Sequence, residues 1–572
     1  MVGNGTTKAT DVHLYDTTLR DGAQMVDVAL TLEDKLKIAQ RLCEFGVGYV
    51  EAGWPGSNPK DAAFFDAWNK IHRGESVPPH GTKLAAFGAT RRKETKCEED
   101  PNIVSLLECQ APVITMVAKA WSEQVVHVLN TTKEENLSMI RDSVAYFKRF
   151  GKEVMLDAEH FFDGFKADPS YDKECIRAAA ESGVDAVVLC ETNGGCLPWD
   201  VEAITAVAVE TLAPWEGVRV GIHTHNDTGM AVANSLAAVR AGATIVQGCI
   251  NGIGERTGNA DLITVAANLE LKMGMSCMPQ GRLSELTDLA HTVADVCHHP
   301  PPKSNPYIGS SAFAHKGGIH VAAVRKLPHS YNHIDPGLVG NAMRSVVSEL
   351  SGRGNILDKV ESAGLQLDKE GVGSVLAMIK QLENEGFAFE NAGASVDMIL
   401  IRRGSLYTPP FKVLEYTVMS GNRLEQDIGT QEGCAARAST NQAMVKLEID
   451  GKVFMSAGEG NGPVDALAAA LRTGLSSKFP QIESVHLKDY NVHLLDTRGS
   501  QSTTRVTIEF SNPACSKWST VGAHTSIVDA SFRALLDGLE FGVLNCTTHG
   551  CKLNNELSSN MLSAQLANGV SP

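Results

Sequence analysis

His223 and His225, two histidines separated by one residue, could share a metal ion. On a β-strand, alternate residues point to the same face, so both imidazoles would reach the same ion. Asp21 would add a hard carboxylate, and two histidines plus a carboxylate with open positions are typical of a catalytic Zn²⁺, Mn²⁺ or Mg²⁺ site. Asn259 is available as a further ligand. The alternative is a pair of core histidines that bind no metal.

Arg20 stands directly before Asp21. A guanidinium beside a metal is well placed to stabilise a developing oxyanion. The alternative is a simple ion pair between the two neighbouring side chains.

The glycine-rich segment 251–259 resembles a phosphate cradle. Its GxGxxxG spacing is not the dinucleotide fingerprint, however, and it does not open the first strand–helix unit. We expect its glycines to let the backbone approach a ligand, or Asn259, closely.

The elements that must position these residues can be read from residue 12 to about 274, where short β-branched apolar runs alternate with amphipathic stretches. The strand-like runs are 12–17, 47–52, 84–88, 113–117, 154–158, 186–190, 218–222 and 244–248. The clearest helical patterns are 32–45, 135–150, 171–182, 230–241 and 262–273, each followed by a glycine. Eight such pairs favour a parallel (β/α)₈ TIM barrel over a doubly wound sheet, which usually has fewer. In a barrel, the carboxyl ends of the strands carry the active site.

Residues 408–545 show three strands followed by one helix, and then repeat this pattern. At a constant offset, Gly458, Val464, Asp465 and Ala466 recur as Gly522, Val528, Asp529 and Ala530. This internal duplication predicts two βββα halves that form a C-terminal regulatory domain for ligand sensing or dimerisation. We expect Gly458 and Gly522 at turns just before the helices, where helix N-termini could receive a small carboxylate ligand.

The predicted domain organisation has four parts. They are a catalytic barrel at 11–275, helical connecting subdomains at 276–400, a regulatory domain at 405–546 and a flexible tail at 547–572. A proline-rich stretch at 300–306 marks the boundary after the barrel, and the polar segment 391–395 is expected to end the connecting helices.

Composition excludes several classes of protein. The 572 residues are 43% hydrophobic and 21% charged, which is ordinary for a globular chain. A net charge of −16 makes nucleic acid an unexpected partner. No apolar run reaches the ~20 residues of a spanning helix, and the first residues resemble no signal or transit peptide. With 13 cysteines and no CxxC pair, we expect reduced thiols and a cytoplasmic protein that binds no membrane.

Long motifs resemble the family of 2-isopropylmalate, homocitrate and citramalate synthases, which are metal-dependent barrels that condense acetyl-CoA with a keto acid. The motifs are the segments 14–24 (LYDTTLRDGAQ), 223–229 (HTHNDTG) and 251–259 (NGIGERTGN). Segments 53–61 and 157–164 are most similar to the citramalate synthase branch. The duplicated C-terminal unit is similar to the family's allosteric domain.

The resemblance implies a role for each matching residue. Asp21, His223 and His225 would bind a divalent metal, with Asn259 as a further ligand or a support for one. Arg20 would polarise the keto oxygen of the substrate. Thr192 would hydrogen-bond the substrate carboxylate, although Glu191 before it stands where the family has Asp.

Three more residues match the family's catalytic set. Glu159 matches its catalytic carboxylate. His320 and Tyr331 match a pair that the connecting subdomain delivers to the active site of the other protomer, which implies a homodimer with composite active sites. Glu159 and this pair compete as the base.

The implied activity is a Claisen-type condensation of acetyl-CoA with pyruvate, followed by thioester hydrolysis to (R)-citramalate and CoA. This reaction leads toward isoleucine, so isoleucine is the first candidate effector and leucine the second. Three alternatives stay open: the same reaction on a larger keto acid, a carbon–carbon lyase, and an amino-acid-binding regulator with an inactive barrel.

Overall fold

The computed structural model describes residues 11–71, 79–345, 348, 353–362, 367–404, 407–421, 440–496, 502–512, 515–547 and 550–551. The chain forms two compact units. The first comprises Met1–Phe313 and Ile334–Ala342, and the second comprises Ala314–His333 and Met343–Pro572. Most of the predicted tail at 547–572 lies outside the described residues.

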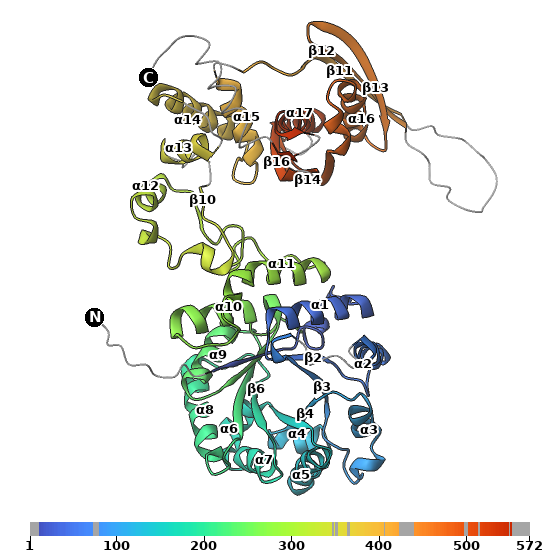
Figure 1. Cartoon of the computed structure of the whole chain (residues 1–572), viewed down its shortest axis with the longest axis vertical. Coiled ribbons are helices and arrows are strands. Elements are labelled where there is room, and N and C mark those ends of the chain that lie inside the picture. The colour runs from blue at the N-terminus through green and yellow to red at the C-terminus, as the bar shows by residue number, and fades with distance from the viewer. Residues whose placement is uncertain are drawn as a thin grey trace, which may run out of the picture. The chain divides into compact units, whose positions relative to one another are not determined.

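Eight parallel strands close into a barrel in chain order, with β1 paired to β8 (Figure 1). They are β1 (His13–Asp16), β2 (Tyr49–Gly53), β3 (Lys83–Ala89), β4 (Val113–Lys119), β5 (Glu153–Glu159), β6 (Ala186–Glu191), β7 (Arg219–Thr224) and β8 (Ile245–Gly248). Each observed strand begins and ends within about two residues of its predicted bounds. The predicted (β/α)₈ barrel is confirmed.

Helices surround the barrel (Figure 1). They are α1 (Leu32–Phe45), α2 (Pro59–Ile71), α3 (Pro101–Glu108), α4 (Ser122–His127), α5 (Lys133–Arg149), α6 (Phe161–Ala167), α7 (Pro169–Glu181), α8 (Pro198–Leu212), α9 (Ala231–Arg240), α10 (Leu262–Asn268) and α11 (Leu286–Val296). Helix α1 begins at a capping box formed by Thr31 and Asp34, and it ends at Gly46, whose φ of 93° is left-handed. Such a φ suits glycine and stops the helix where the sequence predicts.

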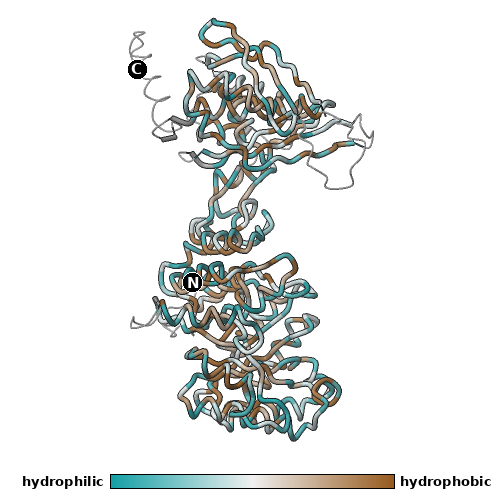
Figure 2. The backbone as a smooth tube through the Cα atoms, turned by 90° about the vertical axis from the view of Figure 1, so that its right-hand side faces the viewer, coloured by the Kyte–Doolittle hydropathy of each residue, from teal (hydrophilic) through white to brown (hydrophobic). Residues whose placement is uncertain are grey.

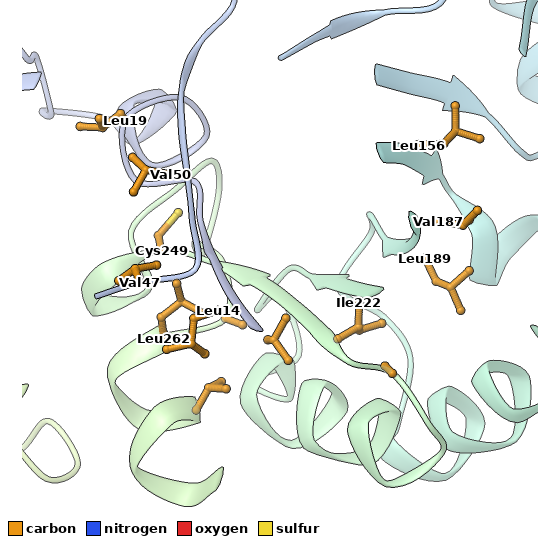
Figure 3. Packing of buried hydrophobic residues seen from close by; sticks show 14 of the residues in the cluster. Leu14, Leu19, Val47, Val50, Leu156, Val187, Leu189, Ile222, Cys249 and Leu262 are labelled. Carbon is orange, nitrogen blue, oxygen red and sulfur yellow. The ribbon is translucent and has the colours of Figure 1, made fainter. Parts of the chain in front are cut away.

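Two apolar layers hold the strands in place. Outward-facing side chains pack against the helices, as Leu14 of β1 does beside Leu262 of α10 (Figure 3). Inward-facing side chains form a second, separate cluster inside the barrel, namely Tyr15, Tyr49, Ala85, Val113, Met155, Ala186 and Ile245. Hydrophobic residues thus gather inside the barrel domain and hydrophilic stretches lie along its periphery (Figure 2).

The second unit begins with helices α12 (Gly318–Lys326), α13 (Arg353–Ser362), α14 (Lys369–Asn384) and α15 (Gly393–Arg403). The expectation that the polar segment 391–395 ends the helices is wrong, because α15 begins within it. Ser395 is buried there. Its hydroxyl accepts a hydrogen bond from the N–H of Val521 and donates one to Asp537 Oδ2, each with a donor–acceptor distance of 3.0 Å. The polar residue Ser395 therefore lies within helix α15 and forms buried hydrogen bonds, so its polarity does not mark the end of the helices.

The C-terminal region has the predicted duplicated βββα form. Its first half is β11 (Lys412–Gly421), β12 (Thr440–Ile449), β13 (Lys452–Gly460) and α16 (Pro463–Ser476). Its second half is β14 (His486–Leu494), β15 (Thr504–Asn512), β16 (Cys515–His524) and α17 (Ile527–Asn545). Both helices pack into one shared hydrophobic core.

The repeated glycines do not lie at turns, so that expectation is wrong. Gly458 lies in β13 and Gly522 in β16. A Cβ at Gly458 would lie 2.3 Å from the backbone nitrogen of Ala470, and one at Gly522 would lie 2.1 Å from the carbonyl oxygen of Ala530. The repeat therefore preserves close packing of each helix on its sheet, and these glycines form no anion site at a helix N-terminus.

Among the described residues, no helix combines the length and the apolar character needed to cross a membrane.

Candidate active site at the carboxyl end of the barrel

The three predicted metal ligands come together at the carboxyl end of the barrel. Asp21 follows β1, His223 lies in β7 and His225 follows it, and one ligand atom from each lies within 4.8 Å of the others. The Nε2 atom of His223 is 3.2 Å from His225 Nε2 and 3.4 Å from Asp21 Oδ2. All three residues are buried. The geometry matches the prediction from strand periodicity.

The site keeps these groups in the protonation states that a metal needs. Burial alone would raise the pKa of Asp21, but the positive charge of Arg20, aided by the two histidines whenever they are protonated, outweighs burial and lowers that pKa. Burial, together with His223, lowers the pKa of His225 to about 4. Burial also lowers the pKa of His223. At neutral pH the carboxylate is therefore ionised and the imidazoles are neutral, as metal ligands must be.

Asn259 supplies a further candidate ligand atom. Its Nδ2 donates to the carbonyl oxygen of Ile253 at 3.2 Å, whereas its buried Oδ1 has no hydrogen-bond partner among the described residues. A Cβ at Gly254, whose φ is 153°, would lie 2.1 Å from Asn259 Nδ2. The glycine thus permits the close approach that the sequence predicts. A buried carbonyl oxygen without a partner beside two imidazoles and a carboxylate fits a divalent cation.

Arg20 is fixed more tightly to Glu51 than to Asp21. Its Nε donates to Glu51 Oε1 at 2.6 Å, while its NH1 lies 3.6 Å from Asp21 Oδ1. The ring of Phe87 covers the guanidinium at 3.9 Å, and Tyr15 donates its hydroxyl to Glu51 at 2.7 Å. Arg20 therefore does more than pair with Asp21, because Glu51 and Phe87 also contact its guanidinium and orient it at the site.

Glu191 shapes the turn that presents Thr192. Its buried carboxylate accepts the backbone N–H groups of Gly195 at 2.9 Å and Cys196 at 3.3 Å. The Thr192 hydroxyl accepts the N–H of His160 at 2.9 Å, so its own proton is free to be donated to a ligand. Glutamate in place of aspartate therefore still organises this loop.

Arg256 and Asp227 form a clamp that sequence reasoning missed. The guanidinium donates to both Asp227 carboxylate oxygens, at 2.8 and 2.9 Å, and to the carbonyl oxygen of Thr192 at 2.7 Å. The clamp joins the loops that follow β6, β7 and β8. Both residues lie in the recognised motifs, but their partnership is non-local and leaves no mark on the sequence.

Glu159 also has a partner that sequence reasoning missed. Lys119 ends β4, pairs in register with Glu159 at the end of β5, and its Nζ forms an ion pair with the Glu159 carboxylate. The predicted fourth strand stops at residue 117, whereas β4 extends to Lys119, so the sequence does not indicate Lys119 as a strand-end residue. An ammonium group thus lies beside the candidate catalytic carboxylate.

His320 and Tyr331 belong to the second unit of the chain, whereas the other predicted site residues belong to the first. The structure brings these two together: their rings stack with centroids 4.2 Å apart and an interplanar angle of 25°. Within their own unit they form a pair, as the resemblance implies.

Comparisons with known proteins cover nearly the whole chain. Residues 11–293 match the HMGL-like family, residues 307–386 match the "homocitrate synthase post-HMGL domain-like" family, and residues 394–543 match the "LeuA allosteric (dimerisation) domain" family. The curated (R)-citramalate synthase of Aquifex aeolicus is 43% identical, covering 95% of this chain and 99% of its own length.

Citramalate synthases and 2-isopropylmalate synthases match the chain at different levels of identity. The (R)-citramalate synthase of Streptomyces coelicolor is 44% identical over 93% of this chain and 96% of its own length. A probable 2-isopropylmalate synthase of Methanopyrus kandleri is 32% identical over 92% and 97%. With the candidate metal ligands assembled at the barrel mouth and identity above 40% along almost its full length, the chain belongs to the (R)-citramalate synthase family.

Proposed function

We propose that this chain is an acyltransferase that condenses acetyl-CoA with pyruvate and hydrolyses the thioester, releasing (R)-citramalate and CoA, in the isoleucine branch of amino-acid biosynthesis. The observation that carries the proposal is the 41–44% identity to curated (R)-citramalate synthases. Probable 2-isopropylmalate synthases are only 29–32% identical. Pyruvate is therefore favoured over a larger keto acid.

A divalent cation such as Zn²⁺, Mn²⁺ or Mg²⁺ would be held by Asp21, His223 and His225, with Asn259 Oδ1 as a further ligand. The burial, neutral imidazoles and partnerless amide oxygen described above support this assignment. When bound, the cation supplies electron withdrawal from the keto group and a fixed orientation of the keto acid.

The chain's own residues carry the other steps. Arg20 donates to the keto oxygen, and Thr192 donates to the carboxylate of pyruvate. A base takes a proton from the methyl group of acetyl-CoA; either Glu159 or the His320–Tyr331 pair fills this role. The resulting enolate carbon bonds to the keto carbon, and the keto oxygen becomes an alkoxide that Arg20 stabilises. The alkoxide then takes up one proton, which balances the proton removed from the methyl group and gives the hydroxyl of the product. Water then adds to the thioester carbon, and CoA leaves as the thiol.

The functional protein is a homodimer in this proposal. The match of residues 394–543 to the LeuA allosteric (dimerisation) domain supports association of two chains. By the family resemblance, His320 and Tyr331 complete the site of the other subunit, so that each active site is composite.

Thiol release from acetyl-CoA across a panel of keto acids tests the proposal. We expect kcat/KM to be highest with pyruvate and lower by about 10- to 200-fold for an acceptor that carries extra methyl groups. The control omits the keto acid and measures unassisted thioester hydrolysis. A preference for 2-ketoisovalerate would assign 2-isopropylmalate synthase activity instead, and no release with any acceptor would reject condensation.

Lys119 should matter for turnover because it holds the Glu159 carboxylate in place. We expect Lys119→Met to lower kcat by about 10- to 100-fold, since small displacements of catalytic groups cost this much. Lys119→Arg should recover part of the loss, and metal content should not change. Lys37→Met, at an exposed position of α1, is the matched control. A kcat for Lys119→Met within twofold of wild type would contradict this role.

A cavity in the regulatory domain is a candidate effector site. It has a volume of about 420 Å³ and lies between α16 and β14. Its lining is Val464, Asp465, Ala468, Arg472, His486, Leu487 and Tyr490. Arg472 and Asp465 could pair with the carboxylate and the ammonium of an amino acid, and the aliphatic lining suits a branched side chain. We propose isoleucine as its ligand, with leucine as the second candidate.

Isoleucine at millimolar concentration should lower the activity of the wild-type enzyme, and Arg472→Met should abolish this response. A truncation near residue 400 would cut α15, so a substitution is the better test. Lys478→Met, exposed just after α16, is the control. If the wild type responds to neither isoleucine nor leucine, the regulatory domain serves dimerisation alone.

A further inference from the structure

Asp157 is a buried carboxylate that the proposed reaction does not use. It lies on β5, one inward-facing position before Glu159, and only 4% of its surface is exposed. Burial, reinforced by the nearby Glu51, raises its pKa far above the ordinary value. A buried carboxyl group is costly unless it is hydrogen-bonded, so its partner indicates what it does. That partner is Gln247 of β8, whose Nε2 donates to Asp157 Oδ1 at 3.0 Å.

Gln247 connects Asp157 to one of the candidate metal ligands. Its side chain is fully buried, and its Oε1 lies 3.0 Å from His223 Nδ1. An amide oxygen can only accept a hydrogen bond, so His223 must carry its proton on Nδ1. The lone pair of His223 is then on Nε2, the atom that faces Asp21 and His225.

The orientation of the Gln247 amide decides this tautomer. A flipped amide would present Nε2 to His223 and would require the proton on the other ring nitrogen. The hydrogen bond that Asp157 Oδ1 accepts from Gln247 Nε2 stabilises the orientation seen in the structure. His225 has no comparable support, since its buried Nδ1 lacks a partner among the residues described. The barrel interior therefore fixes the tautomer of His223, whereas no such hydrogen bond fixes the tautomer of His225.

We infer that Gln247 is a positioning residue of the metal site, that Asp157 holds its amide in the working orientation, and that together they keep His223 in the tautomer that binds a divalent cation. The inference rests on the metal site of the proposed function. Metal-binding histidines generally donate their second ring N–H to such a partner, and loss of that partner costs about 10- to 100-fold in metal affinity. The competing explanation is that both side chains merely fill a polar layer of the barrel.

Mn²⁺ binding to the metal-free, full-length protein separates these explanations without measuring catalysis. We expect Gln247→Leu, which keeps the side-chain volume, to weaken Mn²⁺ binding by about 10- to 100-fold. Asp157→Asn retains an oxygen acceptor for Gln247 Nε2 and should bind Mn²⁺ within a few-fold of wild type, whereas Asp157→Leu should bind it clearly more weakly. The double variant with Asp157→Leu and Gln247→Leu should bind Mn²⁺ no more weakly than Gln247→Leu alone, because Asp157 acts only through Gln247.

Thermal unfolding of each variant identifies losses that come from misfolding, and the Asp157→Asn and Asp157→Leu pair keeps the inference testable if Gln247→Leu does not fold. Mn²⁺ affinity of folded Gln247→Leu within about threefold of wild type would overturn the inference and leave the metal site standing. Equal weakening by Asp157→Asn and Asp157→Leu would overturn the part assigned to Asp157. Failure of the wild type to bind Mn²⁺ would overturn the metal site itself, and the inference with it.

Discussion

Asp21→Asn and His225→Ala should each reduce turnover by about 10³-fold or more while the barrel stays folded. A bound metal contributes several kcal/mol of transition-state stabilisation, and each 1.36 kcal/mol corresponds to about tenfold in rate. Each substitution removes one of the three proposed protein ligands, whose ligand atoms lie within 4.8 Å of one another. Elemental analysis after dialysis should show metal lost in parallel with activity.

The matched control is Asp66→Asn on the exposed face of α2, which should keep both metal and activity. Circular dichroism and thermal unfolding would show that the variants remain folded. Full metal occupancy in both Asp21→Asn and His225→Ala would refute the ligand assignment.

Mixing two inactive variants should restore activity if the active sites are composite. His320→Ala and Glu159→Ala each remove a candidate base, which costs about 10²- to 10⁴-fold. After complete subunit exchange, half of the dimers are hybrids, and each hybrid has one site with both residues intact. We therefore expect about a quarter of wild-type activity to return.

A second mixture provides the control for this experiment. Glu159 and Asp21 both belong to the barrel part of a site. Each subunit of a hybrid between Glu159→Ala and Asp21→Asn therefore has a damaged barrel, and the hybrid contains no intact site. That mixture should stay inactive. No recovery with the His320→Ala mixture, after exchange is verified by mass, would mean that His320 acts within its own subunit or takes no part in the reaction.

Much of the barrel could be predicted because its signals are local. Alternation of apolar runs with amphipathic stretches marks each strand and helix, and glycines such as Gly46 and Gly242 end helices with a left-handed φ. Closure of a parallel barrel then brings all strand ends to one rim. Asp21 and His223 are far apart in the sequence and yet adjacent for that reason alone.

The contacts that refine the site could not be predicted, because they join residues from different strands. Gln247 and Asp157 meet inside the barrel, and Lys119 meets Glu159 across a strand pair. Nothing in the local sequence indicates these partners, since hydrogen bonds and ion pairs depend on the register and closure of the sheet.

The C-terminal domain also has a feature that could not be predicted from the sequence. Its duplication could be recognised from repeated residues, but the reason for Gly458 and Gly522 could not. Glycine is disfavoured within a strand, so the repeated glycines predict turns. The structure shows that a helix backbone lies where a side chain would be, and such close packing is a tertiary property.

The most direct test of the central claim is to identify the product that the full-length enzyme forms from acetyl-CoA and pyruvate. Chiral chromatography with mass spectrometry would measure citramalate, and a thiol reagent would measure CoA in the same sample. We expect one (R)-citramalate for each CoA thiol released, with both products lost on removal of the divalent metal. Thiol release without citramalate, or efficient product formation only from a larger keto acid, would contradict the proposed function.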